Sequence, residues 1–252
     1  MKFPLRLLLA AGLAAAAVAG FTALGFWQLA RLDWKLALID RVEQRVHARP
    51  VAPPARAEWP RIDAAGYEYR RLLLQGRFLH DSETQVRAGT QAGFGWWVLT
   101  PLQLEDGSVV LVNRGYVPPE RRDPATRLEG QPEGVQAVTG LLRLSEPGGT
   151  FMRSNKPQEG LWYSRDVAAI AAARGLADVA PYFVDAEAAP AAAPGQPQGG
   201  LTVLQFRNAH LGYALTWFSM AALLAGTTLY LLRQALRRTK RNDGCGEPLP
   251  TR

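Results

Sequence analysis

The chain has 252 residues, of which 29 are basic and 22 acidic, giving a formal net charge of +7. Residues 33–207 contain 20 basic and 20 acidic residues, so the surplus lies near the two ends. Because it flanks two apolar stretches, this charge indicates membrane orientation rather than nucleic-acid binding. One cysteine, three methionines and three scattered histidines exclude an intrachain disulfide, a thiol-pair copper carrier and a zinc site of regular spacing.

The first apolar stretch, residues 7–30, contains 24 consecutive uncharged residues, which is long enough for a transmembrane helix. A cleaved signal peptide is the competing interpretation, because small residues that suit cleavage occur near Ala17. The apolar character continues past that point to Trp27 and Leu29 and ends in an aromatic and basic girdle, which favours a retained span. Residues 1–6 are then expected to form a cytoplasmic N-terminus.

Helical spacing of apolar residues continues beyond the first span. Leu36, Ile39, Val42 and Val46 share one helical face, so we expect the helix to leave the membrane and to end by Pro50. Four prolines between residues 50 and 60 predict an extended connection there.

Six later segments have the alternation and the flanking turn residues of β-strands. They are residues 69–79, 83–88, 95–104, 108–117, 135–144 and 181–186, with a short helix at residues 165–175. The third and fourth, joined by Glu105, Asp106 and Gly107, form a predicted antiparallel hairpin. We therefore expect residues 31–208 to be a periplasmic α+β domain with a mainly antiparallel sheet. Residues 187–200, rich in Ala, Pro and Gly, are expected to be a mobile loop of little chemical content.

The second apolar stretch contains 22 residues without formal charge, residues 211–232, and we place the second transmembrane helix at residues 209–232. A cluster of arginines and lysine follows, which marks residues 233–252 as a basic cytoplasmic tail. Two spans then place both termini in the cytoplasm. Basic residues after the first span oppose this orientation, but acidic residues are interleaved with them and long translocated domains are less sensitive to charge.

Several motifs, taken in order, resemble those of the Surfeit locus protein 1 family, the membrane assembly factors of cytochrome c oxidase. The resemblance covers nearly the whole chain, and its evident departure is the Ala/Pro insertion before Gly199. The motifs are GFWQLARLDWKLALI, YRRLLLQGRFLHD, WVLTPLQLEDGSVVLVNRGYVP, NKPQEGLWYSRD, PYFVDA and GGLTVLQFRNAHLGYALTW.

The resemblance implies a role in maturing the haem a-containing catalytic subunit of the oxidase. For bacterial members it also implies that haem a is bound, transiently, within the membrane region. The expected partners are the catalytic subunit, haem a synthase and the lipid bilayer, with no nucleic acid. The high ratio of arginine to lysine and the lack of an acidic-poor, Ser-rich leader favour the inner membrane of a bacterium over a mitochondrial precursor.

Three aromatic or imidazole side chains open the second span at spacing i, i+3, i+7: His210, Tyr213 and Trp217. A histidine at membrane depth indicates function, because an unpaired polar group is costly there. With the resemblance, we expect His210 to ligate the haem iron, flanked by Tyr213 and Trp217. The alternative is that His210 caps the helix or binds a lipid headgroup.

On the first span Gln28, Arg31 and Lys35 repeat this spacing at the depth expected for His210. We expect Gln28 to belong to the same site and Arg31, with Lys35, to pair with haem propionates. Ordinary snorkelling of the basic side chains to the membrane surface is the competing interpretation.

In the domain, a predicted strand ends with Asn113, Arg114 and Gly115. We expect these residues to be structural, with Arg114 in a salt bridge. The competing interpretation is a docking surface for the oxidase subunit. Trp162 and Tyr163 are expected in the core more than at a partner site.

No motif of an enzyme is present: the sequence lacks GxSxG, GxxxxGK[ST] and HExxH. His80, Asp81 and Ser82 are neighbours in sequence, which seldom form a catalytic triad, and are expected to face solvent. Three classes remain: a non-enzymatic assembly factor that holds haem a, a haem-free chaperone that binds the oxidase subunit through its periplasmic domain, and a membrane-tethered enzyme or solute-binding domain. The missing catalytic constellation disfavours the third.

Overall fold

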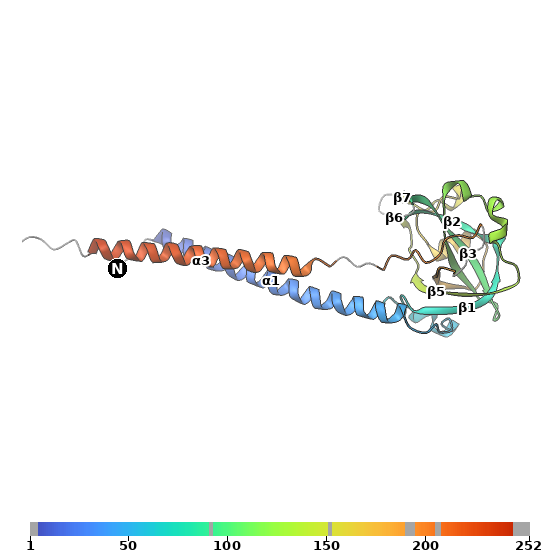
Figure 1. Cartoon of the computed structure of the whole chain (residues 1–252), viewed down its shortest axis with the longest axis horizontal. Helices are drawn as coiled ribbons and strands as arrows, with labels where there is room; N and C mark the ends of the chain where they lie inside the picture. The colour runs from blue at the N-terminus through green and yellow to red at the C-terminus, as the bar shows by residue number, and fades with distance from the viewer. Residues whose placement is uncertain (1–4, 91–92, 151–152, 190–194, 205–207, 244–252) are drawn as a thin grey trace, which may run out of the picture. The chain divides into compact units, whose positions relative to one another are not determined.

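The structure is a computed structural model that describes residues 5–90, 93–150, 153–189, 195–204 and 208–243 (Figure 1). The chain divides into two compact units: the two ends, Met1–Asp40 with Gln205–Arg252, and the middle, Arg41–Leu204. Residues 1–4 and 244–252, which belong to the two predicted cytoplasmic ends, lie outside the described residues.

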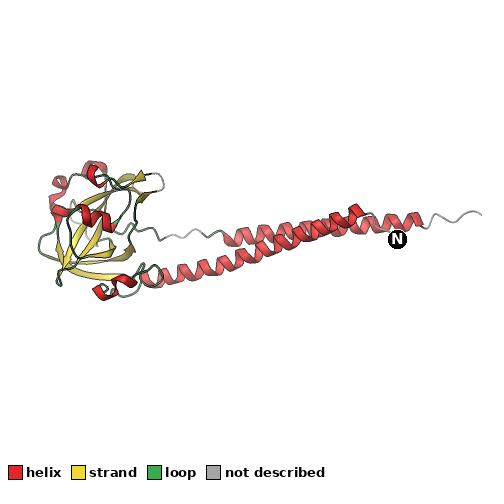
Figure 2. Cartoon of the chain, turned by 180° about the vertical axis from the view of Figure 1, so that it is seen from behind, coloured by secondary structure: helices red, strands yellow, loops and turns green. Residues whose placement is uncertain are grey.

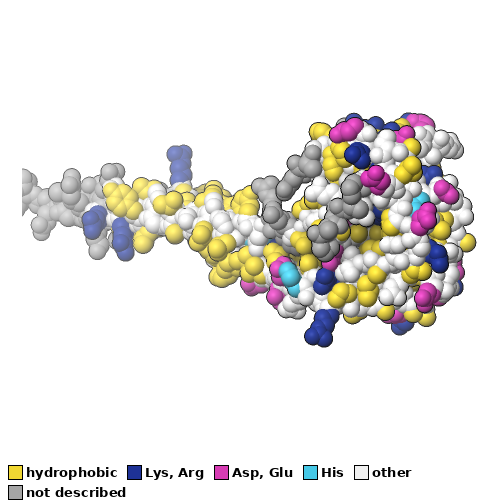
Figure 3. Space-filling view, turned by 45° about the vertical axis from the view of Figure 1, so that its right-hand side comes forward, with side chains coloured by type: hydrophobic (Ala, Val, Ile, Leu, Met, Phe, Trp, Pro, Cys, Tyr) yellow, Lys and Arg dark blue, Asp and Glu magenta, His cyan; other side chains and the backbone are white. Residues whose placement is uncertain are grey.

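Two long helices dominate the first unit: α1 (Leu5–Val46) and α3 (His210–Asp243). Both are long and apolar enough to cross a membrane, with mean hydropathies of 2.2 and 1.5 in their most apolar windows. The helices lie side by side and antiparallel (Figure 2). Apolar side chains line much of their surface (Figure 3). The end of α1 at Val46 confirms the prediction that the helix continues past the apolar stretch and stops before Pro50.

The second unit is built on one six-stranded sheet that closes on itself. Its strands are β1 (Arg71–Phe78), β2 (Thr84–Thr90), β3 (Gly93–Leu104), β4 (Val109–Val117), β5 (Val135–Leu144) and β8 (Val179–Ala186). Their order is β1-β5-β8-β4-β3-β2, and an additional β1–β3 pairing closes a ring of β1, β5, β8, β4 and β3. Only the β4–β8 pair is parallel among these described strands.

The six predicted strands and the β3–β4 hairpin are therefore confirmed, and the sheet is mostly antiparallel as expected. In the hairpin, Leu102 faces Val110 and Gln103 faces Val109. The ring closure and the parallel β4–β8 pair were not predicted, because both join segments distant in sequence.

Apolar residues fill both sides of this sheet, which explains why all nine residues of β4 are buried. One cluster lies among the ring strands: Leu72, Leu74, Leu102, Val110, Val112, Leu142, Ala180, Tyr182 and Val184. A second cluster, on the face that α2 (Val167–Ala173) covers, includes Trp162, Val167 and Ile170. The prediction that Trp162 is a core residue is confirmed, since it is only 2% exposed.

Shorter elements complete the unit. The Asp166 carboxylate accepts a hydrogen bond from the Ala169 backbone N–H at 3.1 Å and caps α2. The other elements are η1 (Arg56–Arg61), η2 (His80–Ser82), η3 (Pro119–Arg121), η4 (Pro124–Gly130), η5 (Pro157–Glu159), β6 (Gly149–Thr150) and β7 (Arg153–Ser154).

Two expectations about connections need correction. The stretch between Pro50 and Pro60 is not extended throughout, because η1 begins at Arg56, where Glu58 accepts a hydrogen bond from the Ala55 N–H. The Ala/Pro-rich stretch is not without chemical content: Glu187 forms an ion pair with Arg71 at 2.6 Å. Residues 190–194 of that stretch lie outside the described residues.

The end of the same stretch is bound to the sheet. The backbones of Tyr116 and Gln198 exchange two hydrogen bonds of 2.9 Å, and Gly200 donates to the Ala186 carbonyl. Gly115, at φ +131°, permits this approach, since a Cβ there would lie 2.2 Å from the Gln198 backbone.

Candidate functional site

His210, the first residue of α3, meets Gln28 of α1 in the first unit. Its Nδ1 donates a hydrogen bond to Gln28 Oε1 at 2.8 Å, and its backbone N–H donates to Asn208 Oδ1 at 3.4 Å. With the proton on Nδ1, the lone pair of the imidazole lies on Nε2. Among the described residues no hydrogen bond engages Nε2. The helix start is thus capped by Asn208, and His210 retains one nitrogen able to bind a metal.

Small residues allow the two helices to approach each other. Ala214 and Ala221 of α3 are buried at 1% and 7% exposure, although only 6% of the most apolar window of α3 is buried. On α1, a Cβ added to Gly25 would lie 2.6 Å from the Phe218 ring. Close packing through small residues is the usual basis of helix association in membranes.

Aromatic rings fill the contact further along the helices. Trp217 stacks on Phe21 with ring centroids 5.7 Å apart, and Phe218 meets Phe26 edge-on at 5.3 Å. Trp217 lies two turns from His210 on the packed face, as its spacing indicates. Its ring is already engaged by Phe21, so it could flank a bound macrocycle only if that stack opened.

No hydrogen bond or ring contact joins the remaining predicted haem-site residues to His210 in the described part of the chain. Tyr213 is 58% exposed. Arg31 is also exposed, and its guanidinium lies 4.6 Å from the Trp34 ring centroid. Of the five predicted site residues, the structure therefore joins Gln28 directly to His210 and leaves Arg31 and Tyr213 apart.

The donor set fits one axial ligand of a haem better than a metal held by side chains alone. Among the described residues, no group of three or more His, Cys, Asp or Glu side chains is placed to hold a metal ion. Haem iron needs only one or two protein ligands, because the macrocycle supplies the others. A histidine whose Nδ1 proton is fixed by an outer partner is the usual form of such a ligand.

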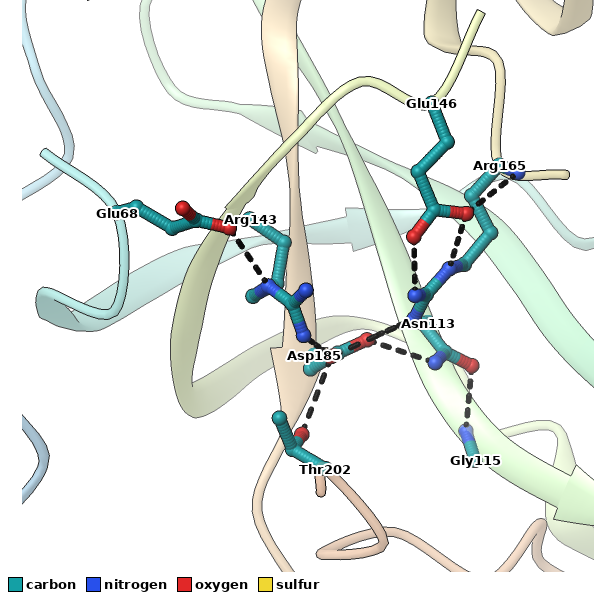
Figure 4. A network of polar contacts seen from close by, with 8 residues as sticks. All are labelled: Glu68, Asn113, Gly115, Arg143, Glu146, Arg165, Asp185 and Thr202. Atoms are coloured by element: carbon teal, nitrogen blue, oxygen red, sulfur yellow. Dashed lines mark hydrogen bonds and ion pairs between the residues drawn. The ribbon is translucent and has the colours of Figure 1, made fainter. Parts of the chain in front are cut away.

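In the second unit, a buried carboxylate connects the ring strands to the segment that follows the Ala/Pro-rich stretch. Asp185 on β8 is 4% exposed and accepts hydrogen bonds from four side chains (Figure 4). The donors are Asn113 Nδ2 at 2.8 Å, Arg165 Nη1 at 3.1 Å, Thr202 Oγ1 at 3.1 Å and Arg143 Nη1 at 3.4 Å. They come from β4, β5, the loop before α2 and residues beyond the sheet, so one carboxylate ties four segments together.

Two further carboxylates neutralise the arginines of this network. Arg165 Nε donates to Glu146 at 3.1 Å, and Arg143 Nε donates to Glu68 at 3.4 Å. Burial alone would raise the pKa of Glu146, but the hydrogen bonds and charge of Arg165 outweigh it and hold that pKa below its ordinary value. A cavity of about 200 Å³ adjoins the network, yet its charged groups are all paired. The network therefore has a structural role: Asp185 holds Asn113, Arg143, Arg165 and Thr202 together, and we call these residues the Asp185 clamp.

Sequence reasoning missed this clamp. Asp185 stands in the apolar strand PYFVDA, and an acidic residue in a buried strand is the signal that a partner must exist. The identity of the partners could not be read, because Arg143 and Arg165 are remote in sequence and unremarkable there.

The structure also bears on the predictions for Asn113, Arg114 and His80. Asn113 and Arg114 are 4% and 8% exposed, which agrees with a structural role and argues against a docking surface. Arg114 lacks the expected salt bridge: it donates to the Gly130 carbonyl and forms no ion pair with a described residue. His80 does not face solvent fully, since its Nε2 lies 3.0 Å from the Pro132 carbonyl oxygen and its Nδ1 is buried.

The fold and the site define a class of protein in which a closed sheet domain is inserted between two membrane-length helices that meet at a hydrogen-bonded histidine. A model of the SURF1 family matches residues 15–222. The chain is 37% identical over 232 residues to Surfeit locus protein 1 of Rattus norvegicus, covering 86% of this chain and 72% of that protein. It is 36% identical over 233 residues to the Homo sapiens protein of that name, covering 86% and 74%, and 35% identical over 241 residues to a SURF1-like protein of Monosiga brevicollis, covering 91% and 88%. The chain belongs to the SURF1 family.

Proposed function

We propose that the protein is a non-enzymatic assembly factor for cytochrome c oxidase that holds haem a at His210 while the catalytic subunit matures. Membership of the SURF1 family supports the assembly role. The single observation that carries haem binding is the hydrogen bond from His210 Nδ1 to Gln28, which leaves the Nε2 lone pair for iron.

The chain's own residues would perform three tasks. His210 supplies the axial nitrogen, and Gln28 fixes its tautomer and ring orientation. Arg31 is proposed to pair with propionates after moving from Trp34, which its exposure permits. Haem a, when bound, supplies the redox-active iron that the oxidase requires, and no chemical step is assigned to this protein.

We place both helices across the inner membrane of a bacterium, with residues 31–208 in the periplasm and both termini in the cytoplasm. The lengths and hydropathies of α1 and α3 support two spans, and the basic tail after residue 232 supports the orientation. The catalytic subunit of the oxidase and haem a synthase are the proposed partners.

The direct test is the visible absorption spectrum of the full chain purified in detergent from a host that makes haem a. Wild type should show bound haem a, and His210→Ala should lose it. Gln28→Leu should weaken binding roughly tenfold or more, because outer partners of metal ligands typically contribute that much, whereas Gln28→Glu should retain it. His47→Ala, at an exposed histidine that contacts Glu43, is the matched control and should bind haem normally.

An unchanged haem spectrum in His210→Ala would contradict ligation by this residue. A wild-type protein that carries no haem but co-purifies with the oxidase catalytic subunit would instead support the second candidate, a haem-free chaperone. The proposal of oxidase assembly would survive that outcome, and the haem site would not.

A further inference from the structure

Arg114 on β4 is a buried cation that forms no ion pair with a described residue. It is 8% exposed, its Nη2 donates to the Gly130 carbonyl, and its Nη1 has no hydrogen-bond partner among the described residues. The Phe78 ring lies 5.0 Å from its guanidinium carbon. Burial lowers the pKa of Arg114 to about 10, so the side chain remains charged at neutral pH.

The other buried charges of the described chain are all paired, which makes Arg114 exceptional. Arg127 and Glu83 form a bidentate pair with side-chain exposures of 0% and 3%. Asp185 is paired with Arg143 and Arg165. Buried charges in proteins are normally neutralised, because an unpaired one is costly. The charge of Glu83 acts on Arg114 as well, but both Glu83 oxygens already accept hydrogen bonds from Arg127. Two buried guanidiniums therefore share one carboxylate, which leaves one positive charge in excess.

Arg114 also lines a cavity of about 590 Å³, within the range of small-molecule sites. Neighbouring residues of a strand point to opposite faces, so Asn113 joins the Asp185 network while Arg114 lies on the other side. The walls around Arg114 are mainly apolar, including Phe78, Val112 and Val138.

The wall composition defines the ligand that fits. A planar guanidinium matches a carboxylate in shape and charge. Arg114 is the only cation among the described lining residues, and the lining carboxylate of Glu187 is already neutralised by Arg71. One cation beside a carboxylate favours a monoanion over a dianionic phosphate, and the apolar walls favour a hydrocarbon body.

We infer that this cavity binds a small amphipathic monocarboxylate of the fatty-acid class, with its carboxylate on Arg114 and its apolar chain against Phe78, Val112 and Val138. This site lies within residues 78–199, separate from His210, and does not depend on haem binding.

The test uses the full chain in lipid nanodiscs and decanoate labelled with ¹³C at the carboxyl carbon. Wild type should give a protein-bound carboxylate resonance that stays ionised to lower pH than decanoate dissolved in the lipid, because pairing with a guanidinium favours the charged form. Decanol, which has the same body without the charge, should compete at least about tenfold more weakly.

Arg114→Gln should lose the bound resonance or raise the Kd at least about tenfold. Arg77→Gln, at an exposed arginine of β1, is the matched control and should bind like wild type. Ala137→Trp keeps Arg114 but places a bulky ring at the exposed rim of the cavity, and it should also abolish binding. Circular dichroism of each variant establishes that the sheet is folded.

The inference is overturned if wild type shows no bound resonance at saturating decanoate. It is equally overturned if folded Arg114→Gln binds decanoate as tightly as wild type, or if decanol binds as tightly as decanoate.

Discussion

The buried pair of Arg127 and Glu83 allows a quantitative test of how this domain is held together. Arg127 Nη1 donates to Glu83 Oε2 at 2.9 Å, its Nη2 donates to Oε1, and its Nε donates to the Arg121 carbonyl at 3.0 Å. We change Arg127 to Met, which preserves much of the apolar stem and removes the charge. Glu83 is then left buried, with Gln85 Nε2 at 2.8 Å as its remaining side-chain donor in the described chain.

Removing one partner of a buried ion pair typically costs about 3–5 kcal/mol, because the other charge stays buried and unpaired. For a domain of this size, each kcal/mol shifts the midpoint of thermal unfolding by about 2–4 °C, so Arg127→Met should lower it by roughly 6–20 °C. The double variant Arg127→Met with Glu83→Leu removes both charges and should recover most of that loss. Arg114→Met provides a contrast: it removes a cation that forms no ion pair, and it should cost less than Arg127→Met, about 1–3 kcal/mol, because only the Gly130 carbonyl loses its donor.

The assay is thermal unfolding of the full chain in detergent micelles, followed by far-ultraviolet circular dichroism and compared across the three variants and wild type. If Arg127→Met and the double variant melted at the same reduced temperature, lost packing rather than an orphaned carboxylate would explain the effect, and the reasoning would be refuted.

Two further perturbations test other parts of the structure. Glu146→Gln should destabilise the domain near neutral pH and reduce the dependence of its stability on acid pH. Arg165 lowers the pKa of Glu146, so the stabilisation by Glu146 is present above the ordinary value of 4.5 and disappears as pH falls through the lower folded value. Thermal unfolding measured over a series of pH values tests this. Gly25→Leu should disrupt the helix contact at Phe218, whereas Gly20→Leu, with open space at its Cβ, should not; cysteine crosslinking between α1 and α3 distinguishes them.

Local patterns predicted the elements of this protein well. The alternation of apolar and polar residues predicted all six strands of the sheet, and the Glu105-Asp106-Gly107 turn predicted the hairpin. Each of these signals is contained within a few consecutive residues. The closure of the ring depends on pairs such as Gly76 with Leu104, whose register no short segment encodes. The parallel β4–β8 pair joins strands about 70 residues apart, and a helix and several loops intervene.

The candidate site was predicted unevenly for a similar reason. Gln28 and His210 were predicted to lie at the same depth in their apolar stretches, and this was enough to place them in one site. The predicted depth was not enough to place Arg31 or Tyr213. Each lies three residues after Gln28 or His210, and a shift of three residues rotates a side chain by about 60° around the helix, away from a narrow packed face. Trp217 shares the packed face but finds Phe21, a residue that carried no polar signal.

The measurement that tests the central proposal most directly is cytochrome c oxidase activity and haem a content in membranes of a strain lacking this gene. Complementation with wild type should restore both, His210→Ala should restore neither, and His47→Ala should match wild type. Undiminished activity and haem a in the deletion strain, with no related gene to compensate, would contradict a role in oxidase assembly.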